Sequence, residues 1–268
     1  GFKMAASINK IVKKKKLFVY SLKDHFFMML LGLFLFSVNY WLVYVAEQDI
    51  TSGLVSVLFS SMVFMNIFNG FIFMKTKVDV KMVVGGIVGI AGIVLIFLPE
   101  VTSFSFSSRE RLGLTLGIVS VYIASVGNII SARNTENNIP VLISNTFGMA
   151  YGALIMLVIS LFSGCDFAIP FTFSYITSLV YLAVFGSVIA FGTYLTLVGE
   201  IGAAKASYAI MMVPLVALGI STVFEGFEWS IEAVLGLVLV LSGNIFLVTK
   251  KYKVDSREIQ PQDKTMDH

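Results

Sequence analysis

Long stretches of apolar residues without Asp, Glu, Lys or Arg recur along the whole chain. There are eight such windows, at residues 25–46, 50–74, 82–98, 112–132, 137–165, 167–199, 206–224 and 233–249. An α-helix rises about 1.5 Å per residue, so about 20 apolar residues cross the roughly 30 Å hydrocarbon core of a bilayer. Because lipid offers no hydrogen bonds to the backbone, we interpret each window as a helix, and the continuously apolar runs disfavour a β-barrel. The pattern predicts an all-α polytopic membrane protein.

Composition agrees with this interpretation and narrows the chemistry. The mean hydropathy is +0.89 and only 13% of residues are charged, against about a quarter in soluble domains. The single cysteine, Cys165, excludes an intramolecular disulfide, and the two histidines, His25 and His268, lie far apart in sequence. No HExxH or Walker motif is present. We therefore expect no metal, no cofactor and no nucleic-acid partner; the expected partners are the lipid bilayer and a small molecule.

Positive charges gather in alternate loops. They lie before the first window, between the second and third, after the fourth, before the seventh and after the eighth, at Lys10, Lys13, Lys14, Lys15, Lys16, Lys23, Lys75, Lys77, Lys81, Arg133, Lys205, Lys250, Lys251 and Lys253. Only Arg109 and Arg111 fall in the opposite set of loops. By the positive-inside rule, the first set and the C-terminus face the cytoplasm.

The two halves of the chain repeat one another. When Met62 is aligned with Pro214, Asn66 faces Leu218 and Phe73 faces Glu225; with one residue removed, the later windows align Gly85 with Gly236 and Gly92 with Gly243. An odd number of helices per repeat gives the copies opposite orientations in the membrane. Inverted repeats are typical of secondary transporters, whose substrate site lies near the midplane between the repeats.

A familiar order of short motifs lies in the second half. GAAKAS, VPLVAL, FEG at residues 224–226, and then Gly236 and Gly243 occur within residues 187–248. In this order they resemble the EamA-type transporters of the drug/metabolite transporter superfamily. The resemblance implies two inverted repeats of five helices, with the fourth and ninth helices lining a central cavity. The first repeat departs from the family pattern, with Met62 in place of the usual Pro and Phe73 in place of the usual Glu.

Eight windows fall short of the ten helices that the resemblance implies. We expect the first helix and most of the second to be missing from this sequence, with residues 1–9 as the end of the second; a naturally short protein is the alternative. The expected organisation is an N-terminally incomplete first repeat at residues 1–98, a second repeat at 112–249 and a cytoplasmic polar tail at 250–268.

Candidate site residues follow from helical spacing within the windows. One face of the ninth family helix carries Ser207, Met211, Pro214, Leu218 and Glu225, and the matching face of the fourth carries Val55, Phe59, Met62, Asn66, Asn69 and Phe73. Amides are costly in hydrocarbon unless they are bonded or face water, so Asn66 and Asn69 are the most informative members. Hydrogen bonding between helices is the alternative role for them.

Other polar side chains extend the set of cavity candidates. Residues able to bond or stack on a ligand are Asn39, Tyr122, Asn128, Tyr194, Tyr208, Ser207 and Met211, in addition to Asn66 and Asn69. Pro214 frees a backbone carbonyl and is a candidate hinge. Glu225 matches the recurring acid of the family, and the resemblance implies a gating or structural role for it.

These features favour a secondary transporter, an exporter of small metabolites such as amino acids or related compounds, that works by alternating access in a bacterial inner membrane. A non-transporting or truncated membrane subunit is the alternative. A membrane-embedded enzyme is disfavoured, since no window holds a charged residue that could serve as acid, base or nucleophile partner. The same absence disfavours strong proton coupling. Substrate, transport direction and a homo-oligomeric state stay open.

Overall fold

A computed structural model describes residues 20–164, 171–224 and 229–248. Its elements are all helical, and they are α2 (Leu22–Leu33), η1 (Phe34–Val38), α3 (Asn39–Ala46), α4 (Ser52–Ser60), α5 (Met62–Met74), α6 (Val80–Ile96), α7 (Leu98–Thr102), α8 (Ser108–Glu136), α9 (Val141–Phe162), α10 (Phe173–Tyr181), η2 (Leu182–Ile189), α11 (Ala190–Ile201), α12 (Ala203–Phe224) and α13 (Ile231–Val248). Six helical stretches are long and apolar enough to cross a membrane, and Val80–Ile96 and Ile231–Ile245 are shorter apolar helices. The predicted all-α membrane fold is confirmed.

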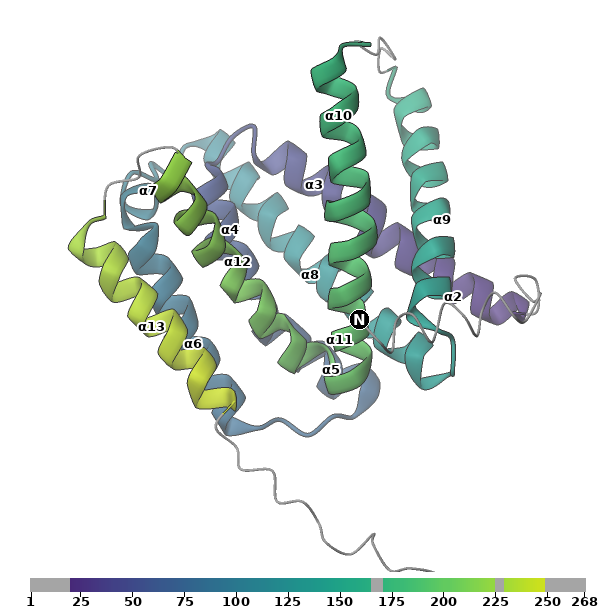
Figure 1. Ribbon diagram of the computed structural model, residues 1–268, viewed down its shortest axis with the longest axis horizontal. Helices are drawn as coiled ribbons and strands as arrows, with labels where there is room; N and C mark the ends of the chain where they lie inside the picture. The colour runs from purple at the N-terminus through teal and green to yellow at the C-terminus, as the bar shows by residue number, and fades with distance from the viewer. Residues whose placement is uncertain (1–19, 165–170, 225–228, 249–268) are drawn as a thin grey trace, which may run out of the picture.

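Local sequence signals set the helix ends. Ser21 and Asp24 form a capping box at the start of α2, and Ser107 with Glu110 forms another at α8. Such boxes satisfy backbone N–H groups that the first helical turn leaves unpaired. Between α11 and α12 the chain turns through Gly202, whose φ of 85° is strained for residues with a side chain. These signals place short turns between long apolar rods (Figure 1).

Two of the rods contain a π-helical segment at matching places. In the register that aligns Gly85 with Gly236, η1 corresponds to the last five residues of η2. The Ser37 hydroxyl donates to the Gly32 carbonyl oxygen at 2.6 Å within this wider turn. Since π-turns are rare and concentrate at functional positions, their repetition marks α2–η1–α3 and α10–η2–α11 as equivalent rods.

Helices α6 and α13 cross where both halves carry glycine. A Cβ added at Gly92 would lie 2.6 Å from the Gly236 carbonyl oxygen, and one added at Gly243 would lie 2.7 Å from the Gly85 carbonyl oxygen. The contact between Gly85 and Gly243 therefore mirrors the one between Gly236 and Gly92. A two-fold relation between the repeats exchanges these contacts, as an inverted-repeat fold requires. Close approach of the backbones supplies the packing that lipid cannot drive.

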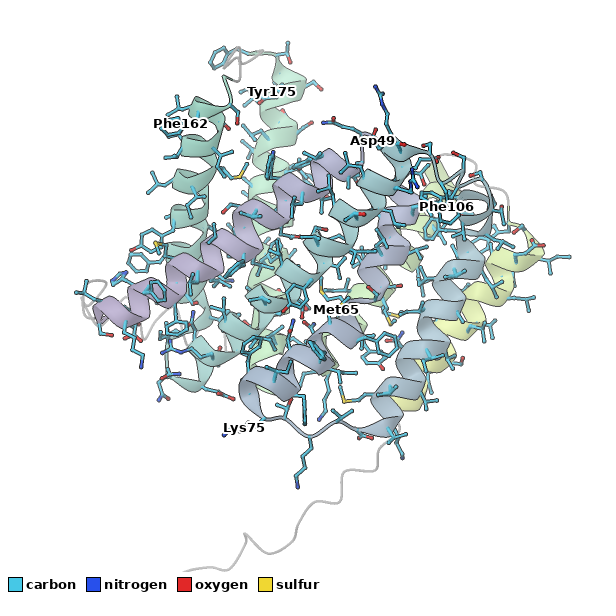
Figure 2. All side chains as sticks on the ribbon, turned by 180° about the vertical axis from the view of Figure 1, so that it is seen from behind. Asp49, Met65, Lys75, Phe106, Phe162 and Tyr175 are labelled. Carbon is cyan, nitrogen blue, oxygen red and sulfur yellow. The ribbon has the colours of Figure 1, made fainter. Side chains whose placement is uncertain are left out.

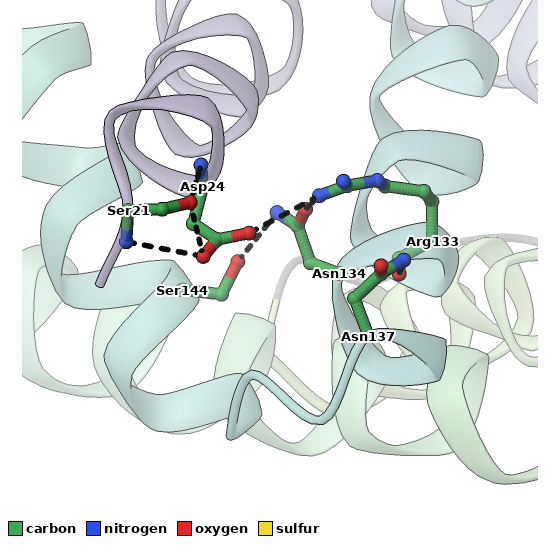
Figure 3. A network of polar contacts seen from close by, with 6 residues as sticks. All are labelled: Ser21, Asp24, Arg133, Asn134, Asn137 and Ser144. Atoms are coloured by element: carbon green, nitrogen blue, oxygen red, sulfur yellow. Dashed lines mark hydrogen bonds and ion pairs between the residues drawn. The ribbon is translucent and has the colours of Figure 1, made fainter. Parts of the chain in front are cut away.

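A polar network joins α2, α8 and α9 near one end of the bundle (Figure 3). Arg133 lies 3.9 Å from Asp24, donates to Asn134 at 3.1 Å and stacks over the Phe27 ring at 3.7 Å. Asn134 in turn donates to the Ser144 hydroxyl at 3.0 Å. This end of the bundle also carries Lys75, whereas Asp49 and Phe106 lie at the other end (Figure 2). The network fixes α2 and α9 to the end of α8.

Candidate functional site

A central cavity of about 740 Å³ lies between the two repeats. It is lined by residues of η1, α3, α4, α5, α8, α11 and α12, namely Leu35, Asn39, Tyr40, Val43, Phe59, Met62, Ala124, Asn128, Ala190, Phe191, Thr193, Tyr194, Leu197, Ala209, Ile210 and Val213. Exposed Tyr40 and Val213 belong to this lining, so the cavity reaches the surface of the described residues between α3 and α12. Its size is typical of small-molecule sites.

The cavity lining obeys the symmetry of the fold. The register that aligns Gly85 with Gly236 pairs lining residues of the first repeat with lining residues of the second, as Asn39 with Ala190, Tyr40 with Phe191, Val43 with Tyr194, Phe59 with Ile210, and Met62 with Val213. A single register thus pairs five lining residues of the first repeat with five of the second. The sequence alignment of Met62 with Pro214 is shifted by one residue from it.

Two buried amides bring polar groups to the cavity. Asn39 is 6% exposed and Asn128 is 1% exposed, and the Oδ1 atom of each has no hydrogen-bond partner among the described residues. The Asn128 amide nitrogen donates to the Tyr194 hydroxyl at 3.1 Å and approaches the Met62 sulfur at 3.4 Å. Leaving a buried acceptor unpaired costs about 1–3 kcal/mol. Both oxygens are therefore suited to accept a hydrogen bond from a ligand's N–H or O–H group.

The rest of the wall is apolar and aromatic. Phe191 stacks edge-to-face on Phe36 at 5.1 Å between ring centroids and on Tyr40 at 6.3 Å. The lining residues include no Asp, Glu, Lys, Arg or His. Such a wall suits a neutral or dipolar molecule with an apolar part, held by its polar groups at the two amides.

Asn66 and Asn69 lie outside the central cavity. Both are fully buried on α5; the Asn66 amide donates to the Ala203 carbonyl at 3.2 Å, and the Asn69 amide donates to the Ser125 hydroxyl at 2.9 Å. These bonds connect α5 to α12 and to α8. Phe73, from the same expected face, is 61% exposed.

The predicted residues of α12 pack away from the cavity. The Tyr208 hydroxyl donates to the Met82 carbonyl, the Met211 sulfur lies against Gly89, and Ser207 bonds within its own helix to Ala204. The glycines of α6 leave room for the Tyr208 and Met211 side chains to pack closely against that helix. The opposite side of α12, with Ala209, Ile210 and Val213, therefore faces the cavity. The alignment that pairs Gly85 with Gly236 also pairs Tyr40 with Phe191 and Phe59 with Ile210. Applied to the sequence, it would have identified Phe191 and Ile210 as lining residues.

The remaining candidates are placed less centrally or are not described. Tyr122 is 39% exposed on α8 and is absent from the cavity lining. Pro214 lies inside α12, which continues as a helix from Ala203 to Phe224. Glu225 lies outside the described residues. Asn39, Asn128 and Tyr194 are the predicted site residues that the structure brings together.

A second, smaller cavity of about 380 Å³ lies toward the end of the bundle that carries Lys75, and we name it the inner pocket. Buried Asn66, Gly70 and Met82 belong to its lining, and so do the charged residues Lys77, Asp79, Glu136, Glu200 and Lys205. The loops bearing Lys77 and Lys205 thus meet at one end of the fold, as the charge pattern predicts. The C-terminal residues 249–268 lie outside the described part, so the side to which they belong stays a prediction.

Comparison with known proteins places the chain among transporters. Residues 4–98 and 111–249 match the EamA-like transporter family. An uncharacterized transporter of Clostridium kluyveri is 23% identical over 92% of this chain and 79% of its own length. Protein PagO of Salmonella typhimurium is 23% identical over 91% of this chain and 80% of its own, and the uncharacterized inner membrane transporter YedA of Escherichia coli is 25% identical over 86% and 73%. A solved crystal structure with 17% sequence identity shares the fold, with a TM-score of 0.71 over 94% of this chain and 84% of its own.

Proposed function

This chain belongs to the EamA-like transporter family, and we propose that it exports small metabolites, such as amino acids or related compounds, by alternating access through the central cavity. It is an integral membrane protein and a membrane transporter: the family match covers most of both repeats, and relatives bear transporter names. The exporter direction and the substrate class are our proposal.

The observation that carries this proposal is the symmetric lining of the central cavity. Equivalent residues of the two inverted repeats face the same space, and transporters of this architecture rock one repeat against the other around such a site. The unpaired Oδ1 atoms of Asn39 and Asn128 offer two hydrogen-bond acceptors in an aromatic enclosure. An amino acid with an apolar side chain fits these features through its ammonium group and its side chain.

Flux through proteoliposomes tests the proposal. We would screen labelled amino acids and related metabolites for saturable uptake and efflux, and then compare Asn39→Ala and Asn128→Ala with Asn145→Ala. Asn145 is a matched control because it is also a buried amide without a hydrogen-bond partner, but it lies on α9 outside the lining. We expect flux to fall by about tenfold in the first two variants, which is about 1.4 kcal/mol, and to persist in the third. Equal losses in all three would contradict the cavity assignment.

A non-transporting membrane subunit is the second candidate, and the exposure of one rod favours it. Helices α10 and η2 contain no buried residue, although their sequence is strongly apolar. A subunit would use this face to hold a partner helix. If the folded protein shows no flux with any tested metabolite, the result would favour the hypothesis of a non-transporting subunit.

We further propose that the protein resides in a bacterial inner membrane with its C-terminus in the cytoplasm. The charge pattern supports this orientation, and one relative is named an inner membrane transporter. Green fluorescent protein fluoresces only when it folds in the cytoplasm, so we expect a fusion after His268 to be fluorescent. Activity of alkaline phosphatase fused at the same point would show that the C-terminus lies on the opposite side of the membrane.

A further inference from the structure

The central cavity and the inner pocket are lined by neighbouring residues of the same three helices. On α5, Met62 lines the central cavity and Asn66, four residues later, lines the inner pocket. On α11, Leu197 lines the central cavity and Val198 lines the inner pocket. On α8, Asn128 lines the central cavity and Ile129 lines the inner pocket. A helical turn rises 5.4 Å. The two spaces therefore adjoin one another at α5, α8 and α11, and these residues belong to the layer between them.

Side chains rather than backbone form this layer. The Asn128 amide nitrogen reaches the Tyr194 hydroxyl at 3.1 Å and the Met62 sulfur at 3.4 Å, so residues of α5, α8 and α11 meet at one point. On the far side, Asn66 bonds to the Ala203 carbonyl at the start of α12. Both repeats thus contribute to a connected set of contacts across the path.

We propose that the inner pocket is the second half of the substrate path and that Met62, Asn66, Asn128 and Tyr194 form a gate between it and the central cavity. This inference rests on the proposed transport function. Met62 belongs to the first repeat, whereas Asn128 and Tyr194 belong to the second. A rocking motion of one repeat against the other therefore separates Met62 from Asn128 and joins the two spaces. In the structure described here the gate is closed.

The rim of the inner pocket fits the same kind of substrate. Lys77 and Lys205 supply positive charge, while Asp79, Glu136 and Glu200 supply negative charge. A rim with both signs can attract each end of a dipolar molecule, and the excess of acidic residues disfavours a simple anion. The path therefore leads a zwitterionic molecule from a charged rim, past the gate amides, to the aromatic cavity.

Cysteine accessibility tests the gate without requiring a known substrate. In a Cys165→Ser background, Ala204→Cys reports on the inner pocket and Ala209→Cys on the central cavity. A membrane-impermeant thiol reagent is applied separately to each face of membrane vesicles, and the face that labels Ala204→Cys defines the inner side. We expect Ala209→Cys to react slowly from that side. Adding Asn66→Ala or Tyr194→Ala should raise the rate by about tenfold or more.

Asn69→Ala is the matched control. It removes another fully buried amide from α5, one bonded to Ser125, and Asn69 lines neither cavity. It should leave the labelling rate of Ala209→Cys unchanged, and unchanged labelling of Ala204→Cys in every variant would show that the fold is intact. The gate is overturned if Asn66→Ala and Tyr194→Ala do not raise the rate, or if Asn69→Ala raises it equally. The labelling rate does not depend on flux. Absence of transport would therefore contradict the proposed function, while the labelling rates would still test the gate.

Discussion

The segments α2–η1 and α10–η2 have equivalent places in the two repeats but opposite surroundings. Met28 and Leu31 are fully buried, whereas their counterparts Leu179 and Leu182 are 51% and 60% exposed. Ser37 is also fully buried, and its counterpart Val188 is 54% exposed. The rods share a π-helical segment and an apolar composition, so local sequence does not explain the difference. Their neighbours do.

Helices α8 and α9 cover α2–η1, and the described residues hold no equivalent cover for α10–η2, although α11 packs against α8, α9 and α12. At the contact with α9, a Cβ added to Gly32 would lie 2.4 Å from the Gly148 carbonyl oxygen. On the second rod, a Cβ added to Gly186 would meet only a Leu182 methyl group, at 3.8 Å. The comparison teaches that repeat symmetry fixes backbone shape and cavity register, whereas burial depends on which neighbours are present.

The largest expected effect breaks the first rod at its closest contact. Gly32→Leu places a side chain where the α9 backbone lies, and overpacking of this severity costs about 3 kcal/mol or more. We expect loss of folded protein or a much lower melting temperature in detergent. Gly186→Leu, on the equivalent but exposed rod, should leave the melting temperature nearly unchanged. Equal shifts in the two variants would mean that the second rod is also tightly covered.

An intermediate effect concerns a cavity position where the rods differ. Tyr194 of the second rod stands where the first has Val43, and only the tyrosine bonds to Asn128. Tyr194→Val should lower flux of the substrate identified by the screen by about tenfold, about 1.4 kcal/mol. Tyr181→Val, which removes an exposed tyrosine from the same rod outside the lining, should leave flux unaltered. Retained flux in Tyr194→Val would show that the hydroxyl is dispensable.

The smallest effect concerns the polar network that holds the first rod at its end. Arg133→Gln removes the stacking on Phe27 and the contact with Asp24. Both groups of the ion pair are partly exposed, so the expected loss is only about 1 kcal/mol in unfolding free energy. Denaturant titration would measure it, with Lys205→Gln as a charge-matched control outside this network. A loss of several kcal/mol would identify the network as the main anchor of the rod.

Much of this protein could be predicted from its sequence alone. Apolar windows of membrane length predicted the helices, because lipid allows few other ways to pair the backbone. The repeated glycines at 85, 92, 236 and 243 revealed the inverted symmetry. These signals are local or periodic, and the physics of one helix in a membrane is enough to interpret them.

Only the tertiary structure decided which helix faces meet. An apolar membrane helix has no strong difference between its sides, so sequence could not show that Ser207, Tyr208 and Met211 turn toward the α6 glycines while Ala209, Ile210 and Val213 face the cavity. Likewise, nothing local distinguishes Asn128, which points into the cavity with Tyr194, from Asn69, which bonds to Ser125. Each amide takes its role from the neighbours that packing brings within 3 Å or so of it. Helices and symmetry are thus set by the chain itself, while the site is set by contacts between distant segments.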